Sequence, residues 1–358
     1  MNDNTSTIAS AQARALVGRH FRMTDHYEVG REKIREFARA VQDGHRAHWS
    51  EDAAAELGYD GLIAPLTFPA LIWVQMQQAM FASELTGYDI GQVLQTEQTL
   101  RMYRPLVAGD RLRCDTFVDS FRQFGDKDFM VVRNVLTNQH KELLQSAATT
   151  VVARTGVAET GQLAAAVDSV IMAGQSMSAR NGAAETQDRL REDAGIAECF
   201  DDIAVAETVD PAETRVRHTI PCFEDLSVGA ELPPRVLSLT RGDLVNYAGV
   251  SGDGNPIHFS DRVVAAAGLP EVVSHGLLTM GLGAGYLTSW LGDPTAVSSY
   301  GVRFAGFAPV AATEPSEIEF RATIKSLDAS RRAATVAITG SCGGRKLFGR
   351  ATAQVLLR

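Results

Sequence analysis

The stretch that decides the fold is 247–280, which reads YAGVSGDGNPIHFSDRVVAAAGLPEVVSHGLLTM. In its middle, Asp253 and His258 stand five positions apart in a glycine-rich run that also contains Asn255 and Pro256. Five positions do not share one face of a helix, where neighbours are three or four apart. Glycine and the Asn-Pro dipeptide instead favour a tight turn. Such a turn can bring both side chains to one point, as an acid/base pair requires.

The segment after this turn is apolar nearly all round from Leu277 to Leu291, and His275 and Gly276 precede it. A helix that is apolar on every face is buried, and the three glycines along it allow a neighbour to approach its backbone closely. The first turn of a helix presents unpaired N–H groups and a partial positive charge. We therefore expect the N–H of Gly276 to stabilise a developing oxyanion.

The motif YAGVSGDGNPIH, followed by SHG and an apolar helix, resembles the hydratase-2 signature of MaoC-like hotdog proteins. These proteins wrap a curved antiparallel sheet around one central helix. The resemblance implies a hydro-lyase that hydrates (2E)-enoyl thioesters or dehydrates (3R)-hydroxyacyl thioesters. It implies catalytic roles for Asp253, His258 and Gly276. Supporting roles are expected for Ser251, Asn255 and His275.

An internal repeat extends the motif to the first half of the chain. Asp43 and His48 precede Asp253 and His258 by the same 210 residues, without a gap. Further identities share this offset: Arg31 and Arg241, Ala38 and Ala248, Gly44 and Gly254, Ser50 and Ser260, and Gly58 and Gly268. The sequence therefore predicts an α+β double hotdog, in which two single-helix units form one continuous sheet.

The remaining elements follow from periodicity. Short helices are expected over 31–41 and 51–57, and a long apolar helix over 66–84, with Pro69 in its first turn. Alternating, β-branched stretches predict strands over 99–103, 111–121, 129–137 and 143–154, and again over 299–304, 317–327, 333–341 and 346–357. A hairpin turn is expected at 342–344, which reads CGG.

These patterns predict three parts: an N-terminal hotdog over 17–155, a linker over 156–215, and a catalytic C-terminal hotdog over 216–358. The linker is rich in Ala, Glu, Asp, Ser and Gly, a composition typical of poorly ordered segments. The residues before 17 read as a short polar lead.

The first unit departs from the motif around its acid/base pair. His45 and Arg46 replace the Asn-Pro dipeptide, and Pro65 and Leu66 replace the His-Gly pair. Proline has no N–H to donate. We therefore expect this unit to be non-catalytic and to shape a tunnel for the acyl chain. The residues expected to line the tunnel are Phe68, Ile72, Trp73 and Met76.

Two alternatives remain for the first unit. Its aromatic and methionine side chains can serve only core packing, and Asp43 with His48 can form a second working site. Separately, REKIREFARAVQ resembles HadA-type subunits, and LTRGDLVNYAGVSGDGNPIH resembles HadB-type subunits, of the (3R)-hydroxyacyl-ACP dehydratases of mycolic-acid synthesis. This resemblance implies a fused dehydratase acting on acyl-ACP in type II fatty acid elongation. An (R)-specific enoyl-CoA hydratase and a non-catalytic binder of acyl thioesters are the other candidates.

Composition restricts the partners. The 358 residues are 45% apolar and carry a net charge of −9, which argues against nucleic acid as a partner. No apolar run reaches the ~18 residues of a membrane span, and the N-terminus lacks a secretory pattern. The four scattered cysteines predict neither a metal site nor disulfides. We expect a cytoplasmic protein without metal or cofactor, a monomer or homodimer, whose partner is acyl carrier protein or a CoA thioester.

Overall fold

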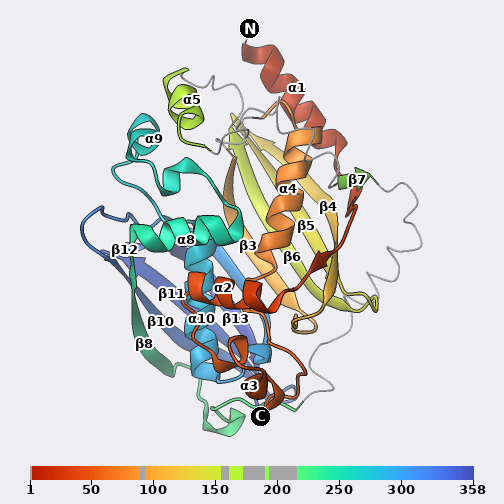
Figure 1. The fold of residues 1–358 in the computed structure, drawn as a ribbon, viewed down its shortest axis with the longest axis vertical. Helices are drawn as coiled ribbons and strands as arrows, with labels where there is room; N and C mark the ends of the chain where they lie inside the picture. Colours follow the sequence, from red (N-terminus) through yellow and green to blue (C-terminus); the bar gives the residue numbers. More distant parts are fainter. Residues whose placement is uncertain (1, 89–92, 155–160, 172–189, 193–215) are drawn as a thin grey trace.

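The computed structural model describes residues 2–88, 93–154, 161–171, 190–192 and 216–358. These residues form two similar halves, each with a curved sheet wrapped around one long helix (Figure 1). The N-terminal half contains α1 (Asn2–Ala15), β1 (His20–Met23), β2 (Tyr27–Glu28), α2 (Arg31–Ala40), η1 (Arg46–His48), α3 (Glu51–Ala55), α4 (Ala70–Glu84), β3 (Val93–Met102), β4 (Arg111–Phe124), β5 (Lys127–Thr137) and β6 (Leu143–Arg154). The C-terminal half contains η3 (Phe223–Asp225), β8 (Glu231–Leu239), α8 (Arg241–Ser251), η4 (Pro256–His258), α9 (Asp261–Ala266), α10 (Gly276–Leu291), η5 (Pro294–Ala296), β9 (Val297–Phe304), β10 (Ser316–Asp328), β11 (Ala333–Cys342), β12 (Arg345–Lys346) and β13 (Phe348–Leu356). Between them lie α5 (Gly161–Asp168) and β7 (Leu190–Glu192).

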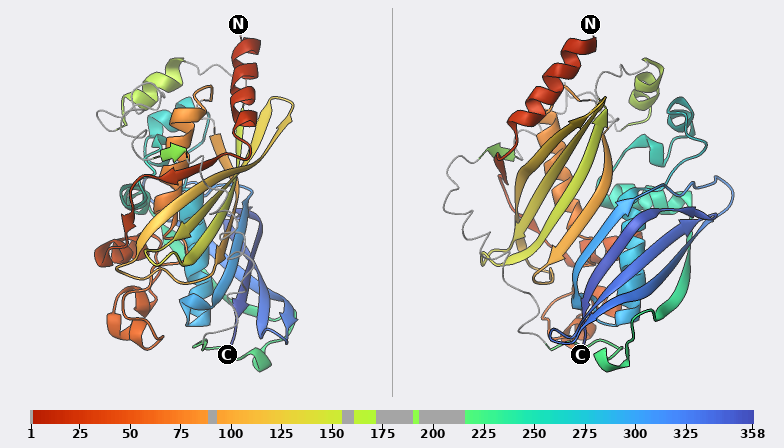
Figure 2. Two further views of the ribbon diagram at one scale, coloured as in Figure 1. Left: turned by 90° about the vertical axis from the view of Figure 1, so that its right-hand side faces the viewer. Right: turned by 180° about the vertical axis from the view of Figure 1, so that it is seen from behind.

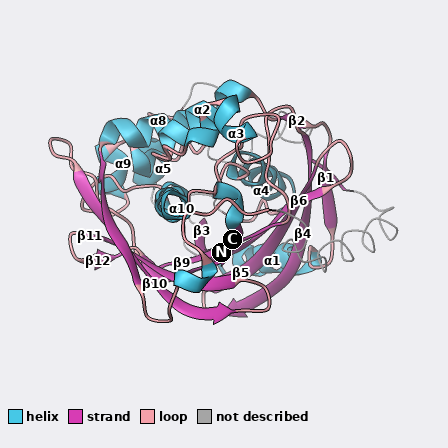
Figure 3. Cartoon of the chain, turned by 90° about the horizontal axis from the view of Figure 1, so that it is seen from below, coloured by secondary structure: helices cyan, strands magenta, loops and turns pink. Residues whose placement is uncertain are grey.

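One sheet runs through both halves. Among the described residues its strand order is β7-β1-β4-β5-β6-β3-β9-β13-β11-β10-β8, with β2 paired to β4 and β12 to β11. The halves meet where β3 and β9 pair antiparallel, with Leu100 opposite Tyr300. Seen from behind, the two halves of the sheet lie side by side (Figure 2), and seen from below the sheet curves around α4 and α10 (Figure 3). This architecture confirms the predicted double hotdog.

The strands form where side chains alternate between the helix and the solvent. In β10, Ile318, Phe320, Ala322 and Ile324 are buried, whereas most residues between them are partly or fully exposed. This period of two is that of a sheet with one covered face. The CGG hairpin is also confirmed, since Gly343 and Gly344 both have positive φ angles, of 54° and 77°, as a tight hairpin turn between β11 and β12 requires.

The central helices cover the concave face. Helix α10 occupies the predicted segment and is buried except at Gly276, Ser289 and Trp290. Helix α4 begins at Ala70 rather than Leu66, because Pro69 takes the N-cap position. Helices α2 and α8 pack on each other over the seam, with the rings of Phe37 and Tyr247 6.2 Å apart. The two halves therefore share one continuous core.

Two segments outside the repeat also fold. The expected polar lead is instead the helix α1, whose Ala9 and Ala13, with Leu16 just after it, join a buried cluster with residues at the end of α4. Most of the predicted linker lies outside the described residues, but α5 packs on α9 through Ala166 and Val167. The division at 155/156 and 215/216 stays a prediction. No helix in the described ranges is both long and apolar enough to cross a membrane.

Candidate active site

The turn after α8 positions Asp253. Gly252 ends the helix with φ at 78°, a left-handed conformation that glycine adopts without strain. The Asp253 N–H then donates to Oγ of Ser251 (3.2 Å), and the Asn255 N–H donates to the Asp253 carboxylate (3.4 Å). The Asn255 side chain caps η4 by accepting from the Ile257 N–H (3.2 Å). Ser251 and Asn255 thus hold the shape of the turn.

His258 is the last residue of η4, and one of its ring nitrogens is hydrogen-bonded to the backbone. Its Nδ1 lies 2.8 Å from the carbonyl oxygen of Val273, and because a carbonyl only accepts, this nitrogen carries the proton. Its Nε2 therefore holds a lone pair. Burial lowers the pKa of His258 below its usual range, although the negative charge of Asp253 and the bond to Val273 oppose the shift. The ring is thus a neutral base.

His275 and Gly276 begin α10 directly beside this ring. The rings of His258 and His275 stack with centroids 3.7 Å apart, and His275 donates through Nε2 to the Asp253 carbonyl oxygen at 3.3 Å. Burial, with a contribution from neighbouring His258, lowers the pKa of His275 to about 2. Gly276 is exposed at the first position of the helix. Its N–H has no partner within the helix, because the first N–H groups of a helix have none.

The same cluster has the spacing of a metal site. Asp253, His258 and His275 each offer a donor atom, and these atoms lie within 4.8 Å of one another. Imidazole binds a metal along a lone pair in the ring plane, and tetrahedral sites need ligands that converge from different directions. Two stacked rings direct their lone pairs side by side instead. The arrangement fits an acid/base pair with a packed neighbour better than a metal centre.

The matching pair in the N-terminal half is closed off. His48 is fully buried, with Nδ1 bonded to the Ile63 carbonyl oxygen (2.6 Å) and Nε2 3.3 Å from the Asp43 carboxylate. Asp43 is 3% exposed and accepts from Thr288 of α10 (3.4 Å). Burial pushes its pKa up, but the hydrogen bond and charge of His48, helped by His45, hold it below the usual range. The pair is buried against the opposite half.

Two glycines in α10 allow residues of the N-terminal half to lie close to the helix backbone. A Cβ at Gly281 would lie 2.7 Å from Cγ1 of Val41, so that Val41 would have to shift, and one at Gly285 would lie 3.4 Å from Cβ of Asp43. Gly281 and Gly285 thus permit a close approach at the seam, whereas Gly283 is approached by Tyr300 and Phe320 of its own half.

The predicted tunnel residues lie in the core. Phe68, Ile72, Trp73 and Met76 are at most 2% exposed and belong to the main hydrophobic cluster. None of them lines the cavity found at the seam. Their role toward an acyl chain stays a prediction.

Several contacts of the site were missed at the sequence level. Val273, whose carbonyl fixes the His258 tautomer, has no signal beyond its alignment with Ile63 at the repeat offset. The fully buried Tyr247 packs its ring 4.9 Å from that of His275. His275 was predicted only as a supporting residue, yet it contacts both members of the acid/base pair.

Family models match both halves. Residues 15–146 match the FAS1-like dehydratase domain region, and residues 227–339 match the MaoC-like domain. A solved structure described as a MaoC-like dehydratase is 41% identical, with a TM-score of 0.82 over 97% of this chain and 100% of that one. The chain belongs to the MaoC-like dehydratase family.

Other similarities are narrower. The UPF0336 protein ML1910 of Mycobacterium leprae is 46% identical over 141 residues, which are 39% of this chain and 89% of that protein. The double-hotdog protein RV0216 of Mycobacterium tuberculosis is 14% identical, with a TM-score of 0.59 over 95% of this chain and 96% of its own, and this similarity supports the fold alone. Membership of the MaoC-like family is thus carried by the full-length match.

Proposed function

We propose that this chain interconverts (3R)-hydroxyacyl and (2E)-enoyl thioesters at a single site in its C-terminal half. The observation that carries the proposal is the approach of Asp253 and a neutral His258 to each other, beside the exposed Gly276 at the first position of α10. Acid/base groups and a hydrogen-bond donor for the thioester oxygen are the parts that this elimination needs.

The dehydration runs through one face of the substrate. The Gly276 N–H donates to the thioester oxygen and stabilises the enolate-like charge that forms there, an effect of about 3 kcal/mol per donor. Nε2 of His258 accepts the C2 proton, because this nitrogen enters the reaction with a free lone pair. The Asp253 carboxylate stabilises the imidazolium. The C3–O bond then breaks, and the departing oxygen takes the proton from Nε2 and leaves as water.

The positions of the supporting residues fit this scheme. Asn255 and Ser251 keep the Asp253 turn in shape, and His275 holds it from the other side. A positive charge on His275 would make it harder for His258 to accept a proton. Because His275 is neutral, it has no such effect. These residues position the pair rather than exchange protons.

We further propose acyl-ACP of type II fatty acid elongation as the natural substrate. The resemblance of the halves to paired dehydratase subunits supports this carrier. A CoA thioester presents the same reacting atoms, so comparing kcat/KM for one acyl chain on ACP and on CoA tests the carrier. A kcat/KM at least as high on CoA would favour the (R)-specific enoyl-CoA hydratase instead.

The test of the activity is hydration of medium- and long-chain (2E)-enoyl-CoA, followed by loss of the conjugated-thioester absorbance. Asp253→Asn should lower kcat at least ~100-fold, whereas Asp43→Asn should retain turnover because Asp43 is sealed against α10. Half the activity remaining in each variant would mean two working sites. A folded wild type that turns over neither CoA nor ACP thioesters would mean that the chain only binds them.

A further inference from the structure

A row of packed aromatic rings leads from the N-terminal half to the proposed acid/base pair. The ring centroids of Phe37 in α2 and Tyr247 in α8 are 6.2 Å apart, and those of Tyr247 and His275 are 4.9 Å apart. His275 in turn stacks on His258 at 3.7 Å. The first three rings are at most 1% exposed, and His258 is 7% exposed. Because protein interiors are close-packed, the position of each ring depends on the one before it.

Hydrogen bonds alone do not fix the ring of His275. Its Nε2 donates to the Asp253 carbonyl oxygen at 3.3 Å, which is long for such a bond. Its Nδ1 is buried and has no hydrogen-bond partner among the described residues. The orientation of this ring therefore depends on the two rings that it packs against, Tyr247 and His258.

The orientation of His275 matters because this residue contacts both members of the acid/base pair. Its ring stacks on the ring of His258, and its Nε2 holds the backbone of Asp253. A tilt of His275 would move both groups relative to the substrate. A displacement of about 1 Å in an active site can lower the rate about 100-fold, so the packing behind His275 bears directly on turnover.

That packing is supplied across the seam. Helices α2 and α8 pack on each other there, and Phe37 is fully buried between them and its own core. On its far side Phe37 packs against Phe68, with ring centroids 5.5 Å apart. Phe37 is thus held by the N-terminal half while it packs against Tyr247 of the C-terminal half.

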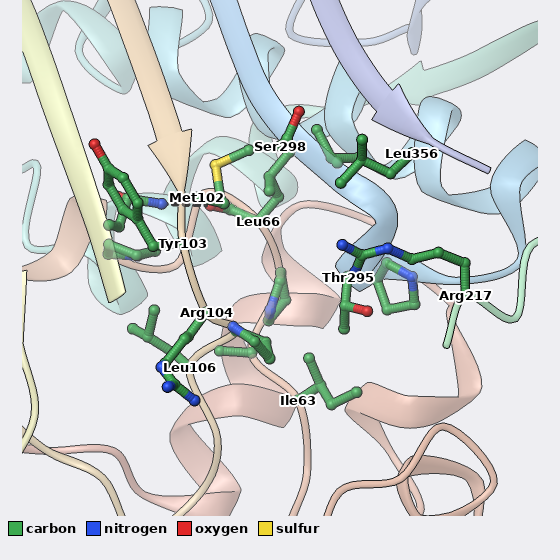
Figure 4. A pocket seen from close by; sticks show the side chains of 17 residues that line it. Ile63, Leu66, Met102, Tyr103, Arg104, Leu106, Arg217, Thr295, Ser298 and Leu356 are labelled. Carbon is green, nitrogen blue, oxygen red and sulfur yellow. Dashed lines mark hydrogen bonds between the residues drawn. The ribbon is translucent and has the colours of Figure 1, made fainter. Parts of the chain in front are cut away.

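The corresponding row in the N-terminal half is interrupted. Phe37 and Tyr247 are counterparts at the repeat offset of 210, but Pro65 stands where the C-terminal half has His275. Pro65 instead lines a cavity at the seam (Figure 4). An aromatic contact from the opposite half is therefore continued to an acid/base pair only on the C-terminal side.

We infer that Phe37 is a positioning residue for the acid/base pair of the opposite half, and that it acts through the rings of Tyr247 and His275. This role rests on the proposed function, which assigns the reaction to Asp253 and His258. It gives the N-terminal half a part in turnover beyond its share of the sheet, because one of its side chains sets the orientation of the base.

Kinetics of enoyl-CoA hydration by full-length Phe37→Leu test this role. Leucine keeps the site apolar but removes the ring, so kcat should fall at least ~10-fold. KM should change by less than about twofold, because no group that binds the substrate is altered. Phe21→Leu is the matched control: Phe21 is 1% exposed but belongs to a separate hydrophobic cluster, so this variant should keep the wild-type kcat.

Conservative substitutions separate positioning from a general loss of stability. Tyr247→Phe keeps the ring and should retain most of the kcat that Tyr247→Leu loses. Phe37→Met keeps most of the side-chain volume without a ring and should lose kcat as Phe37→Leu does, so the result does not depend on the folding of one variant. Equal losses in the two Tyr247 variants, or wild-type kcat in both Phe37 variants, would overturn the inference.

NMR of the histidine rings tests the same coupling without turnover. In the full chain, the Hε1 resonances of His258 and His275, assigned with their glutamine variants, should both shift in Phe37→Leu and stay in place in Phe21→Leu. Unchanged resonances in Phe37→Leu would show that Phe37 does not set these ring positions, whatever the activity. A wild type that turns over no thioester would instead refute the proposed function, and shifted resonances would still support the coupling of the rings.

Discussion

The two halves carry the same Asp-His pair at the same spacing and differ in what surrounds it. In the C-terminal half, Asp253 is half-buried and an exposed glycine N–H lies at the start of the adjacent helix. In the N-terminal half, Asp43 and His48 are at most 3% exposed and are packed against α10. The same two side chains thus form a pair with a half-buried carboxylate in one half and a fully enclosed pair in the other.

This difference shows that the pair alone does not define the site. Both histidines bind a backbone carbonyl through Nδ1, at the equivalent residues Ile63 and Val273, so the tautomer is the same in each half. What distinguishes the C-terminal half is access from solvent and a free N–H at the first position of its helix. In the N-terminal half the pair instead contacts α10 of the other half, through Asp43 and Thr288.

The largest expected effect is that alanine substitution of the two histidines changes different quantities, kcat for His258 and the free energy of unfolding for His48. His258→Ala should lower kcat for enoyl-thioester hydration by about 1000-fold, because it removes the group that exchanges the C2 proton. His48→Ala should instead lower the free energy of unfolding by about 3–5 kcal/mol, because it leaves the Asp43 carboxylate buried without its partner. Steady-state kinetics and urea unfolding of both variants check this.

The comparison fails in two recognisable ways. A stable His48→Ala protein with a large loss of kcat would make the N-terminal pair catalytic. An active His258→Ala protein would remove the C-terminal pair from the mechanism. Asp43→Asn in the same assays distinguishes lost charge from lost volume, since asparagine has nearly the same size.

The next effect concerns the helix N-terminus. Gly276→Pro should lower kcat by about 100-fold, because it removes the one N–H assigned to the thioester oxygen. The helix itself should persist, since proline suits the first helical position and His275 already has the extended conformation (φ −61°, ψ 136°) that precedes proline. Enoyl-CoA hydration at saturating substrate measures the loss.

Gly276→Ala is the matched control. It keeps the N–H, and its Cβ would lie 3.4 Å from the Phe304 ring, so kcat should change by no more than about threefold. Equal losses in the alanine and proline variants would assign the effect to crowding by any side chain rather than to the missing donor.

Much of the fold could be predicted because its determinants are local. The strands could be predicted because apolar and polar residues alternate along them, with the apolar side chains facing the helices. Helix α10 could be predicted because it is an apolar run without charges. The start of α4 was placed four residues early, because apolar character at Leu66 does not reveal that the segment before Pro69 forms a turn. The helix α1 was missed, since its few apolar residues are buried only by partners distant in sequence.

The candidate site likewise has a part that local sequence predicts and a part that depends on distant residues. The motif predicts Asp253, His258 and Gly276 as candidates, because a tight turn and a helix start are encoded within a few residues. The contacts that decide their chemistry come from further away: Val273 fixes one tautomer, and Tyr247 packs on His275. The sealing of Asp43 by Thr288 depends on a residue 245 positions later in the chain.

The smallest expected effect is the contribution of His275, in the C-terminal half, to the pH dependence of stability. The pKa of His275 is about 2 in the folded protein and near 6.5 when unfolded, so between these values only the unfolded state binds the proton. Stability is therefore unaffected above pH 6.5 and falls as the pH drops below it, by about 2 kcal/mol between pH 7 and pH 5 for this one group. Pro65, its N-terminal counterpart, contributes no such term. Urea unfolding at pH 7 and pH 5 should show a loss smaller by about this amount in His275→Gln, whereas substitution of the exposed His140 should leave the wild-type loss unchanged; an undiminished loss in His275→Gln would place the acid sensitivity elsewhere.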